Sequence, residues 1–341
     1  MLTIKTDYSL KAHNSFGLDV KAKYFVEYES AEDLAGFLSG RDTGDSRVFH
    51  IGSGSDILFT GDFDGYVLHS AVKGIHILEQ HNDHVVLSVG AAEDWDNFVA
   101  WTIAHGYYGL ENLSLIPSEV GAAAVQNIGA YGAEAKDFIT SVDCVDMRDG
   151  TTVCHLNHQC GFGYRKSNYK ESWRGQYAIL RVTFTLPTAF HPNISYKGLN
   201  DLPTDGLTAE TVRSRVIQLR RSKLPEPSET GNAGSFFLNP IITAEHYANL
   251  LQAYPDIPHY PARDAIDTEQ GHVKVPAAWL IEQAGWKGKS QGRAGVYKNQ
   301  PLVLVNLGGA TPGDIVNLAS AIVKDVQRMF GITLIPEVIY L

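Results

Sequence analysis

The first candidate for chemistry is a serine in a loop of small residues. Ser235 lies in the segment TGNAGSFFLNP, directly before two phenylalanines. A serine nucleophile usually occupies a G-x-S-x-G elbow, which this segment lacks, and none of the 13 histidines stands out as its base. A covalent serine hydrolase is therefore disfavoured. Two interpretations stay open: a buried hydroxyl that donates a proton, and a serine that completes a turn.

A glycine loop at residues 52–57 is the second candidate. Its sequence, GSGSDI, follows a predicted strand, but Ile57 stands where the Rossmann fingerprint has its third glycine. The Lys-Ser or Lys-Thr pair of a P-loop is missing too. Successive N–H groups of small residues can still form an anion-binding nest. Phosphate binding and an ordinary tight turn are equal alternatives here.

A longer run of small residues, IPSEVGAAAVQNIGAYG, covers residues 116–132. Side chains this small would not fill a core, so the run suits a backbone that closely approaches a large flat ligand. Gln126 and Asn127 would then offer amide donors and acceptors. The alternative is a glycine-rich helix start followed by a loop.

Cationic residues give two further candidates. Lys223 ends the basic segment VRSRVIQLRRSK near the Ser235 loop, where it could bind a diphosphate, although a solvated helix face is the simpler interpretation. Arg165 is an isolated cation in GYRKS, and such arginines usually form surface ion pairs. The segment CHLNHQC, residues 154–160, fits no common zinc spacing, so we expect no metal site.

The composition limits the class of protein. The chain has 341 residues, enough for two or three domains, and 44% of them are hydrophobic. A formal net charge of -10 disfavours a general nucleic-acid or membrane-surface binder, because such binding needs clustered Lys and Arg. The N-terminus lacks the apolar run of a signal peptide, no stretch is long and apolar enough for a membrane span, and the three cysteines are sparse. We therefore expect a cytoplasmic protein with no nucleic-acid partner and no membrane insertion.

The elements that must position these residues alternate between helix and strand. Helical periodicity and capping signals predict helices at 31–40, 93–106, 207–223, 276–285 and 311–331. In the second of these helices one face should carry Trp95, Phe98, Val99, Thr102 and Ile103. Short apolar runs predict strands at 21–30, 47–51, 66–70, 74–80, 84–90, 138–150, 151–156, 177–186, 301–308 and 332–341. The fold class is therefore α+β.

Several motifs together resemble one family. NSFGLDV, GSGSDILF, GLENLSLIPSEVGAAAVQNIGAYGAE, FGYRKSNYK, GNAGSFFLNP and LIPEV occur in the order found in UDP-N-acetylenolpyruvoylglucosamine reductases, also called UDP-N-acetylmuramate dehydrogenases. The resemblance runs from about Asn14 to Glu337. Tyr196 and the chain length are similar to the longer, type I form of the family.

The resemblance implies a fold with distinct parts. It implies a two-lobed FAD-binding domain of the vanillyl-alcohol oxidase (PCMH-type) superfamily at 14–187, with lobes at about 14–66 and 67–187. A C-terminal α+β substrate domain would follow at 208–330, and residues 331–341 would return to the active site as a strand. FAD would be bound without a covalent bond. The residues implied to contact it are Gly52, Ser53, Gly54, Ser55, Asp56, Pro117, Gly121, Gln126, Asn127, Ile128 and Gly129.

The resemblance also implies an activity in bacterial peptidoglycan synthesis. NADPH, the co-substrate, would reduce FAD, and the flavin would pass a hydride to the enolpyruvyl ether of UDP-N-acetylglucosamine. Arg165 and a protonated Glu337 would stabilise the enolate, and Ser235 would donate the proton. The residues implied to bind substrate are Tyr164, Tyr196, Lys223, Asn239 and Gln300. We expect a monomer.

Some residues depart from the family pattern. Ser53 and Asp56 stand where glycine and asparagine are usual, and Ser118 and Glu119 stand where glycine and a small residue are usual. A carboxylate near a diphosphate adds repulsion, so the contacts of this loop can differ here. Two alternatives remain: an oxidase on the same flavin fold, and a flavin- or nucleotide-sugar-binding protein without activity.

Overall fold

The structure is a computed structural model that describes residues 2–40, 47–261 and 271–341. The chain forms two compact units, each assembled from separate stretches. Unit 1 comprises Met1–Tyr8, Ala22–Ser53 and Phe63–Arg220. Unit 2 comprises Ser9–Lys21, Gly54–Asp62 and Arg221–Leu341, so the chain passes from one unit to the other inside the glycine loop.

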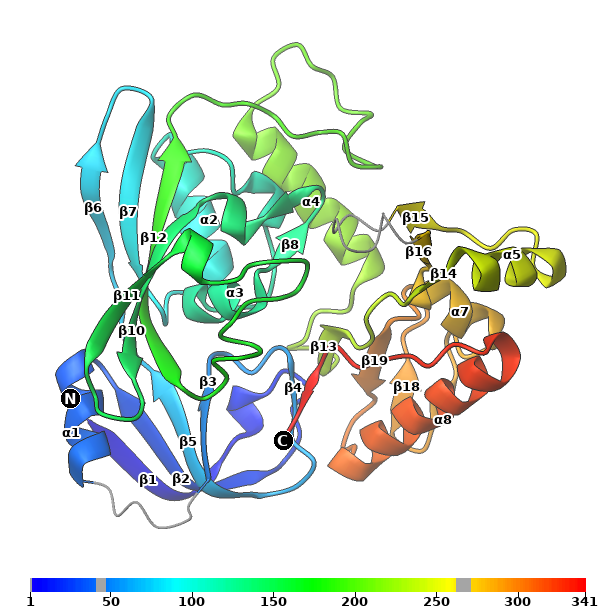
Figure 1. The fold of residues 1–341 in the computed structure, drawn as a ribbon, viewed down its shortest axis with the longest axis horizontal. Helices are drawn as coiled ribbons and strands as arrows, with labels where there is room; N and C mark the ends of the chain where they lie inside the picture. Colours follow the sequence, from blue (N-terminus) through cyan, green and yellow to red (C-terminus); the bar gives the residue numbers. More distant parts are fainter. Residues whose placement is uncertain (1, 41–46, 262–270) are drawn as a thin grey trace. The chain divides into compact units, whose positions relative to one another are not determined.

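Unit 1 contains two larger sheets. Their strands are β1 (Thr3–Ser9), β2 (Lys21–Tyr28), β3 (Arg47–Ile51), β5 (Phe63–Ser70), β6 (Ile75–Gln80), β7 (His84–Gly90), β10 (Ile139–Asp146), β11 (Thr152–Leu156) and β12 (Tyr177–Pro187). The four-stranded sheet has the order β1-β2-β5-β3, with β5 parallel to both β2 and β3. The five-stranded sheet has the order β11-β10-β12-β7-β6 and is antiparallel throughout (Figure 1).

Helices cover both sheets of unit 1. Leu34 and Phe37 of α1 (Ala31–Gly40) are buried in a cluster with residues of β2, β5, β10 and β12. Helices α2 (Trp95–Ala104) and α3 (Val120–Gln126) lie against one face of the five-stranded sheet (Figure 1). The unit also contains the short pair β8 (Gly129–Ala130) and β9 (Ala133–Glu134).

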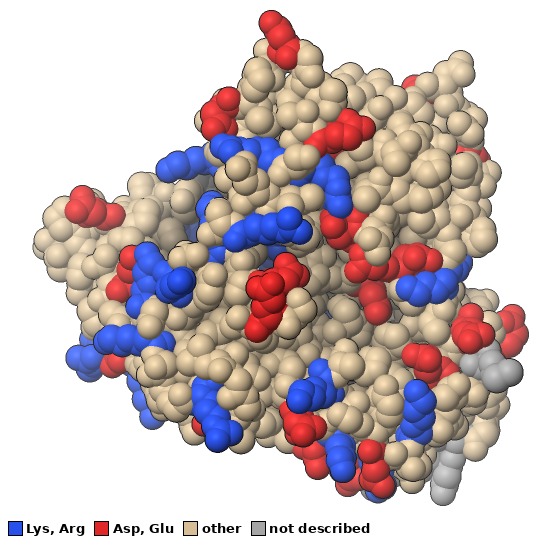
Figure 2. All heavy atoms as spheres, turned by 180° about the vertical axis from the view of Figure 1, so that it is seen from behind, with Lys and Arg blue, Asp and Glu red and all other residues tan. Residues whose placement is uncertain are grey.

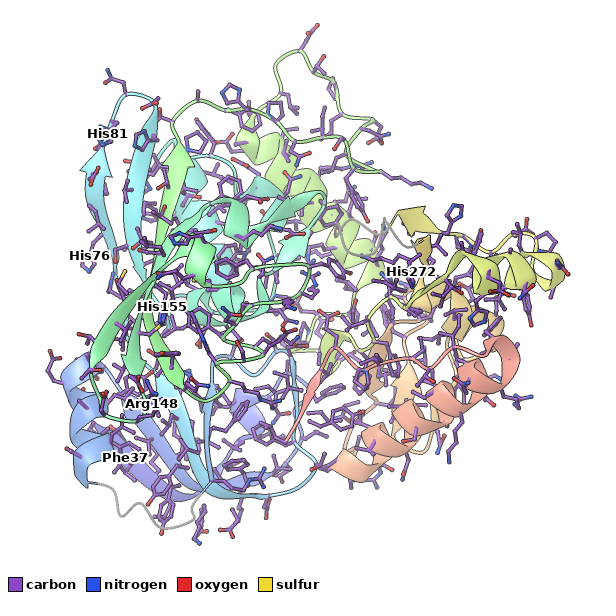
Figure 3. The ribbon with its side chains drawn as sticks, viewed as in Figure 1. Phe37, His76, His81, Arg148, His155 and His272 are labelled. Carbon is purple, nitrogen blue, oxygen red and sulfur yellow. The ribbon has the colours of Figure 1, made fainter. Side chains whose placement is uncertain are left out.

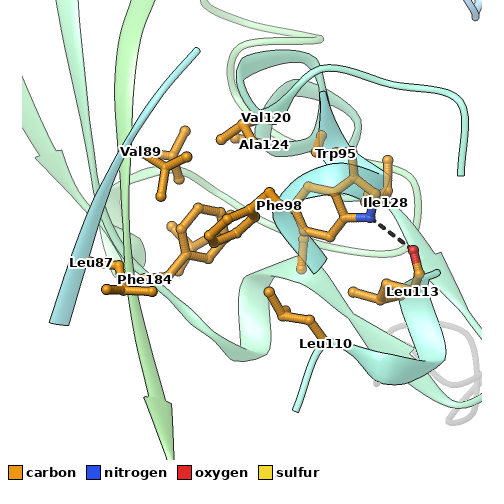
Figure 4. Packing of buried hydrophobic residues seen from close by; sticks show 14 of the residues in the cluster. Leu87, Val89, Trp95, Phe98, Leu110, Leu113, Val120, Ala124, Ile128 and Phe184 are labelled. Atoms are coloured by element: carbon orange, nitrogen blue, oxygen red, sulfur yellow. Dashed lines mark hydrogen bonds between the residues drawn. The ribbon is translucent and has the colours of Figure 1, made fainter. Parts of the chain in front are cut away.

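The largest hydrophobic core lies between α2, α3 and the five-stranded sheet. The fully buried indole of Trp95 donates its N–H to the carbonyl of Leu113 at 2.8 Å (Figure 4). The rings of Trp95, Phe98 and Phe184 pack with centroid distances of 5.1 to 6.1 Å. Aromatic side chains of this size supply much of the burial free energy of a core. The buried face of α2 is the one that the sequence predicts.

Unit 2 combines three small sheets with three complete α-helices among its described residues. Its strands are β4 (Ile57–Leu58), β13 (Asn232–Ser235), β14 (Ile241–Thr243), β15 (Tyr260–Pro261), β16 (His272–Lys274), β17 (Ser290–Gln291), β18 (Ala294–Val296), β19 (Val303–Asn306) and β20 (Ile339–Tyr340). They form sheets of order β13-β19-β18-β17, β14-β16-β15 and β20-β4. Its helices are α5 (Ala244–Ala253), α7 (Ala277–Gln283) and α8 (Pro312–Phe330).

The end signals of α8 are confirmed. Thr311 and Asp314 form a reciprocal capping box, with distances of 3.3 Å and 2.8 Å between each backbone nitrogen and the other side chain. Pro312 occupies the first turn, and Gly331 ends the helix with φ of 67°. One apolar face of α8 then packs on β18 and β19.

The predicted strand at 332–341 is wrong in extent. Only Ile339–Tyr340 is a strand, and it pairs in parallel with β4. Pro336 has no N–H to give to a ladder, and it forms only an isolated bridge with Phe237. Helix α5 and the strands β1, β14 and β16 were not predicted from the sequence, because they are short or have exposed residues and so show little periodicity.

Helix α4 (Ala209–Lys223) is capped by Thr208, whose hydroxyl accepts from the N–H of Thr211 at 3.3 Å. A bidentate ion pair connects this helix to α2. The two terminal nitrogens of Arg213 donate to the two carboxylate oxygens of Asp96 at 2.6 Å and 2.9 Å. A second pair, Arg215 with Asp201 at 2.8 Å, is more exposed.

The face seen in Figure 2 mixes acidic and basic side chains. None of the described helices is long and apolar enough to cross a bilayer.

The ion pair of Asp96 with Arg213 should stabilise unit 1. Burial raises the pKa of Asp96, but the bonds from Arg213 and the N–H of Leu115 outweigh it and lower the pKa below its usual value. Asp96→Asn should cost about 2 kcal/mol at pH 7, because it leaves a partly buried guanidinium with a neutral partner. Urea titrations measure this difference.

The pH dependence has a defined sign. A carboxylate whose pKa is lowered by folding stabilises the folded state above its unfolded pKa and loses that effect as the pH falls. The difference between wild type and Asp96→Asn should therefore shrink below about pH 4. The control Asp201→Asn, in the exposed pair on the same helix, should change stability by less than about 0.5 kcal/mol. Equal effects of the two substitutions would contradict a special role for Asp96.

Candidate active site

The glycine loop packs tightly on an N-terminal turn of unit 2. Gly54 has φ of 69°, and a Cβ at this position would lie 2.0 Å from the carbonyl oxygen of His13. The buried side chain of Asn14 fixes that turn, because its amide donates to the carbonyls of Leu10 and Leu18 at 2.8 Å and 3.1 Å. Only glycine fits at position 54. The turn that contains the NSFG motif therefore packs against the loop and fixes its position.

Backbone hydrogen bonds hold part of the glycine loop in place. The carbonyls of Gly54 and Asp56 accept bonds from the backbone of Ser15 and Ile339 at 3.1 Å and 3.0 Å, which ties them to the protein. The side chains at positions 53 and 55 are small hydroxyls. Neutral N–H and O–H donors of this kind suit a diphosphate, whereas the carboxylate of Asp56 opposes it.

Gly52, on the unit 1 side of the loop, lies against an acidic side chain. A Cβ at Gly52 would lie 3.1 Å from a carboxylate oxygen of Glu119 and 3.1 Å from the Cβ of Ala122. Glu119 precedes α3, and its carboxylate does not cap that helix. The acidic side chain of Glu119 therefore lies directly beside the predicted phosphate-binding loop.

The small-residue run 116–132 fills a core after all. Val120, Ala123 and Ala124 of α3 are fully buried in the main cluster, which corrects the expectation that side chains this small could not do so. Gly121 allows the helix to approach Ala91, since a Cβ there would lie 2.8 Å from the Cβ of Ala91. Packing alone thus explains Gly121. Pro117, at the start of the run, is exposed.

Asn127 ends α3 as a left-handed cap with φ of 43° and is completely buried. Its amide nitrogen donates to Glu134 at 2.9 Å and to the carbonyl of Gly163 at 2.7 Å, and its oxygen accepts from Lys136 at 3.0 Å. Both amide hydrogens are therefore used inside unit 1. A contact of Asn127 with a ligand would have to come from its backbone. The side chain of Gln126 accepts from Lys170, and Ile128 is buried in the main core.

Arg165 lies in a strained turn in unit 1. The backbones of Gly163 and Lys166 exchange hydrogen bonds at 3.0 Å and 3.1 Å, and Arg165 between them has φ of 53°. Non-glycine residues adopt this region rarely, and such strain is concentrated at functional sites. The guanidinium approaches Gly129, where a Cβ would lie 3.4 Å away, and lies 5.8 Å from the centre of the Tyr164 ring. Tyr164 is 40% exposed.

Unit 2 brings together two distant parts of the sequence at the predicted proton donor. Ser235 is the last residue of β13 and is exposed, while Phe236 and Phe237 behind it are buried. Glu337 donates its backbone N–H to the carbonyl of Phe236 at 2.9 Å, and Phe237 forms a bridge with Pro336. The structure therefore places the backbones of Ser235 and Glu337 close to one another.

The predicted substrate-binding residues divide between the units. In unit 2, Lys223 is the last residue of α4 and is exposed. The side-chain oxygen of Asn239 accepts a hydrogen bond of 2.9 Å from the N–H of Ala277, where α7 begins. Gln300 closes the turn before β19. Strand β13, which pairs with β19, carries Ser235. In unit 1, the ring of Tyr196 packs edge-on against Tyr131 at 5.2 Å and is 46% exposed.

The cysteine and histidine segment does not converge on a metal. Cys154 is exposed, whereas Cys160 is buried and His155, labelled in Figure 3, shares a hydrogen bond of 2.9 Å with Tyr169. Burial raises the pKa of the Cys160 thiol to about 11. Across the described residues, no group of three or more His, Cys, Asp or Glu side chains could bind a metal ion.

One polar cluster near the glycine loop was not predicted from the sequence. His69 of β5 lies between Glu27 and Glu119, at 3.1 Å and 3.2 Å. Its members are about 40 to 90 residues apart in the chain, so no local motif could have shown them.

Two family models match this chain. Residues 22–154 match the model of an FAD binding domain, and residues 226–341 match the model of the C-terminal domain of UDP-N-acetylenolpyruvoylglucosamine reductase. The reductase of that name from Porphyromonas gingivalis is 43% identical over 343 residues, with both chains covered completely. The one from Bacteroides fragilis is 44% identical over 336 residues, covering 97% of this chain and 98% of the relative.

A solved structure shows the same fold. The crystal structure of the reductase from Thermus caldophilus superposes with a TM-score of 0.68 at 21% identity, covering 100% of this chain and 98% of that one. The expected FAD-binding domain with a C-terminal α+β domain is thus confirmed. The similarity to relatives along the whole chain shows that the protein belongs to the family of UDP-N-acetylenolpyruvoylglucosamine reductases and is an oxidoreductase with an FAD-binding domain.

Proposed function

We propose that this protein reduces the enolpyruvyl group of UDP-N-acetylglucosamine enolpyruvate to give UDP-N-acetylmuramate. NADPH is the co-substrate, FAD is bound without a covalent bond, and the reaction is a step of bacterial peptidoglycan precursor synthesis in the cytoplasm. The observation that carries this proposal is the similarity along the full chain to reductases of this name. We further propose that the enzyme acts as a monomer.

The FAD would be bound by the glycine loop and the run around α3. Gly52, Ser53, Gly54 and Ser55 would face its diphosphate with neutral donors. The backbone at positions 117, 121 and 126–129 would line the rest of the cofactor, since several side chains there are used within the protein. When bound, FAD supplies a hydride carrier between NADPH and the enolpyruvyl substrate.

Arg165 and Glu337 would stabilise the anion that develops at the substrate carboxylate. The guanidinium offers a planar pair of donors, and the left-handed turn at 163–166 fixes its direction. A neutral Glu337 could donate a hydrogen bond to the same anion. Preorganised donors of this type are usually the largest contribution of a protein to such a step.

Ser235 would donate the proton to the carbon next to the carboxylate. Its position at the end of β13, next to the backbone of Glu337, supports this role. The hydroxyl is exposed in the structure, so bound substrate must exclude water from it for efficient proton transfer. Tyr164, Tyr196, Lys223, Asn239 and Gln300 would bind the rest of the substrate, with Lys223 and Tyr196 at its diphosphate.

The parts of the chain would divide the work. We propose an FAD-binding region at 14–187 with lobes at about 14–66 and 67–187, and a substrate-binding domain at 208–330. Residues 331–341 would carry Glu337 to the site, and β20 anchors this segment by pairing with β4.

Ser235→Ala separates the two half-reactions. The variant should bind FAD, and NADPH should reduce the flavin at the wild-type rate, because neither step needs this proton. Reoxidation by the enolpyruvyl substrate should fall by roughly 100- to 10,000-fold. Stopped-flow absorbance of the flavin measures both steps. Ser290→Ala, at an exposed serine in the same sheet, is the control. Unchanged reoxidation in Ser235→Ala would remove the assignment.

Gly54→Ala tests the architecture of the loop. The added Cβ cannot lie 2.0 Å from the carbonyl of His13, so the loop must move. We expect a loss of stability of about 2 kcal/mol or more and a protein purified without yellow colour. Gly61→Ala is the matched control, because nothing lies within 4 Å of its Cβ and its φ is not left-handed. A yellow Gly54→Ala protein with unchanged FAD affinity would contradict the proposed contact.

A further inference from the structure

A histidine between two carboxylates adjoins the glycine loop in unit 1. Nδ1 of His69 lies 3.1 Å from Glu27, and Nε2 lies 3.2 Å from Oε1 of Glu119. The other oxygen of Glu119, Oε2, is the one that a Cβ at Gly52 would approach to 3.1 Å. One carboxylate therefore contacts the imidazole and also lies against the backbone of the loop.

The backbone around Glu119 leaves this side chain little freedom. Glu119 forms a bridge with Asp94, and the next two residues donate to the carbonyls of Glu93 and Ala91, both at 2.9 Å. The side chains of His69 and Glu119 are only 13% and 16% exposed, whereas that of Glu27 is 35% exposed. A nearly buried carboxylate needs a charged or hydrogen-bonding partner, and His69 is the one placed to serve.

Apart from the two carboxylates, the titratable groups that face His69 are uncharged. His69 is therefore the residue of this cluster that can carry a positive charge. On β3, His50 shares a hydrogen bond of 2.5 Å with Tyr28 of β2. Burial, and then repulsion from His69, lower the pKa of His50 to about 3, so it is neutral at physiological pH. Burial raises the pKa of Tyr28, which stays neutral as well. The ring of Phe25 on β2 stacks on His69 without adding charge.

We propose that His69 is a positioning residue that, as an imidazolium, neutralises Glu119 and holds it against Gly52, so that the glycine loop can accept the diphosphate of FAD. This inference rests on the proposed role of the loop in FAD binding. It explains how the chain accommodates an acidic side chain directly beside the proposed phosphate-binding loop. Loss of the proton would leave Glu119 without a positively charged partner beside a dianionic group.

The direction of the proton equilibrium supports this role. Burial by itself lowers the pKa of His69, but hydrogen bonds and charge attraction from Glu119 and then Glu27 outweigh it, and the pKa is raised. The imidazolium is present below that pKa and is lost as the pH rises through it. FAD affinity should therefore fall as the pH rises through this pKa, which lies above the ordinary histidine value of about 6.5.

FAD titrations of the flavin-free protein between pH 6 and 9 test the proposal. For the wild type, we expect affinity to fall about tenfold across this range, which corresponds to a shift of about one unit in the pKa of His69 when FAD binds. Glu119→Gln should match the wild type at pH 6 and should lose most of the pH dependence. His69→Gln should bind FAD about tenfold more weakly at pH 6, with no such pH dependence.

A double variant and a control variant complete this set of FAD titrations. His69→Gln combined with Glu119→Gln should recover affinity close to that of the wild type at pH 6, because the repulsive charge is gone. His84→Gln, in an exposed pair with Asp83 at 2.8 Å, should leave the pH profile unchanged. If all variants follow the wild-type profile, the role of His69 is overturned while FAD binding stands. If the wild type does not bind FAD at any pH, the proposed function fails, and this inference fails with it.

A measurement on the wild-type protein tests the proposal without depending on the folding of any variant. NMR titration of the histidine ring nitrogens in the wild-type protein should show His69 protonated at pH 6 and its pKa raised further when FAD is bound. A neutral His69 at pH 6, or a pKa that FAD leaves unchanged, would overturn the proposal.

Discussion

The close approach of two backbone segments organises unit 1. Residues 118–121 pair with 91–95: Trp95 donates to the carbonyl of Ser118 at 3.0 Å, and Gly121 donates to that of Ala91 at 2.9 Å. Because Gly121 has no Cβ, α3 can lie close enough for Val120 and Ala123 to reach the main core. The same pairing directs the side chain of Glu119 away from the helix and toward the glycine loop.

Backbone strain is concentrated in the region that carries the proposed site of unit 1. Of the five non-glycine residues with positive φ among those described, four lie between positions 115 and 165: Leu115, Asn127, Tyr131 and Arg165. Each such residue costs of order 1 kcal/mol, so surrounding bonds must maintain it. The buried amide of Asn127 does so by linking α3 to residues 134, 136 and 163. That network sets the turn that carries Arg165.

Unit 2 builds its part of the site by joining segments that lie about 100 residues apart. The carbonyl of Phe236 accepts from Glu337, and its N–H donates to Leu302 at 2.8 Å, so the residues before β19 and β20 meet the chain next to Ser235. Phe236 and Phe237 are buried there and leave the serine at the surface. Hydrophobic burial thus fixes the position of a polar group whose proposed role requires access to substrate.

Local signals in the sequence determined much of the fold. The apolar face of α2, the capping box of α8 and most strands of the five-stranded sheet follow from periodicity and capping, which act over a few residues. Motifs also determined the family, and with it the expected roles of Arg165, Ser235 and Glu337. The sequence did not show that α3 fills a core, that residues 332–338 are not a strand, or that His69 lies between Glu27 and Glu119. Only the tertiary structure decided these points, because each depends on contacts between residues far apart in the chain, which no local pattern encodes.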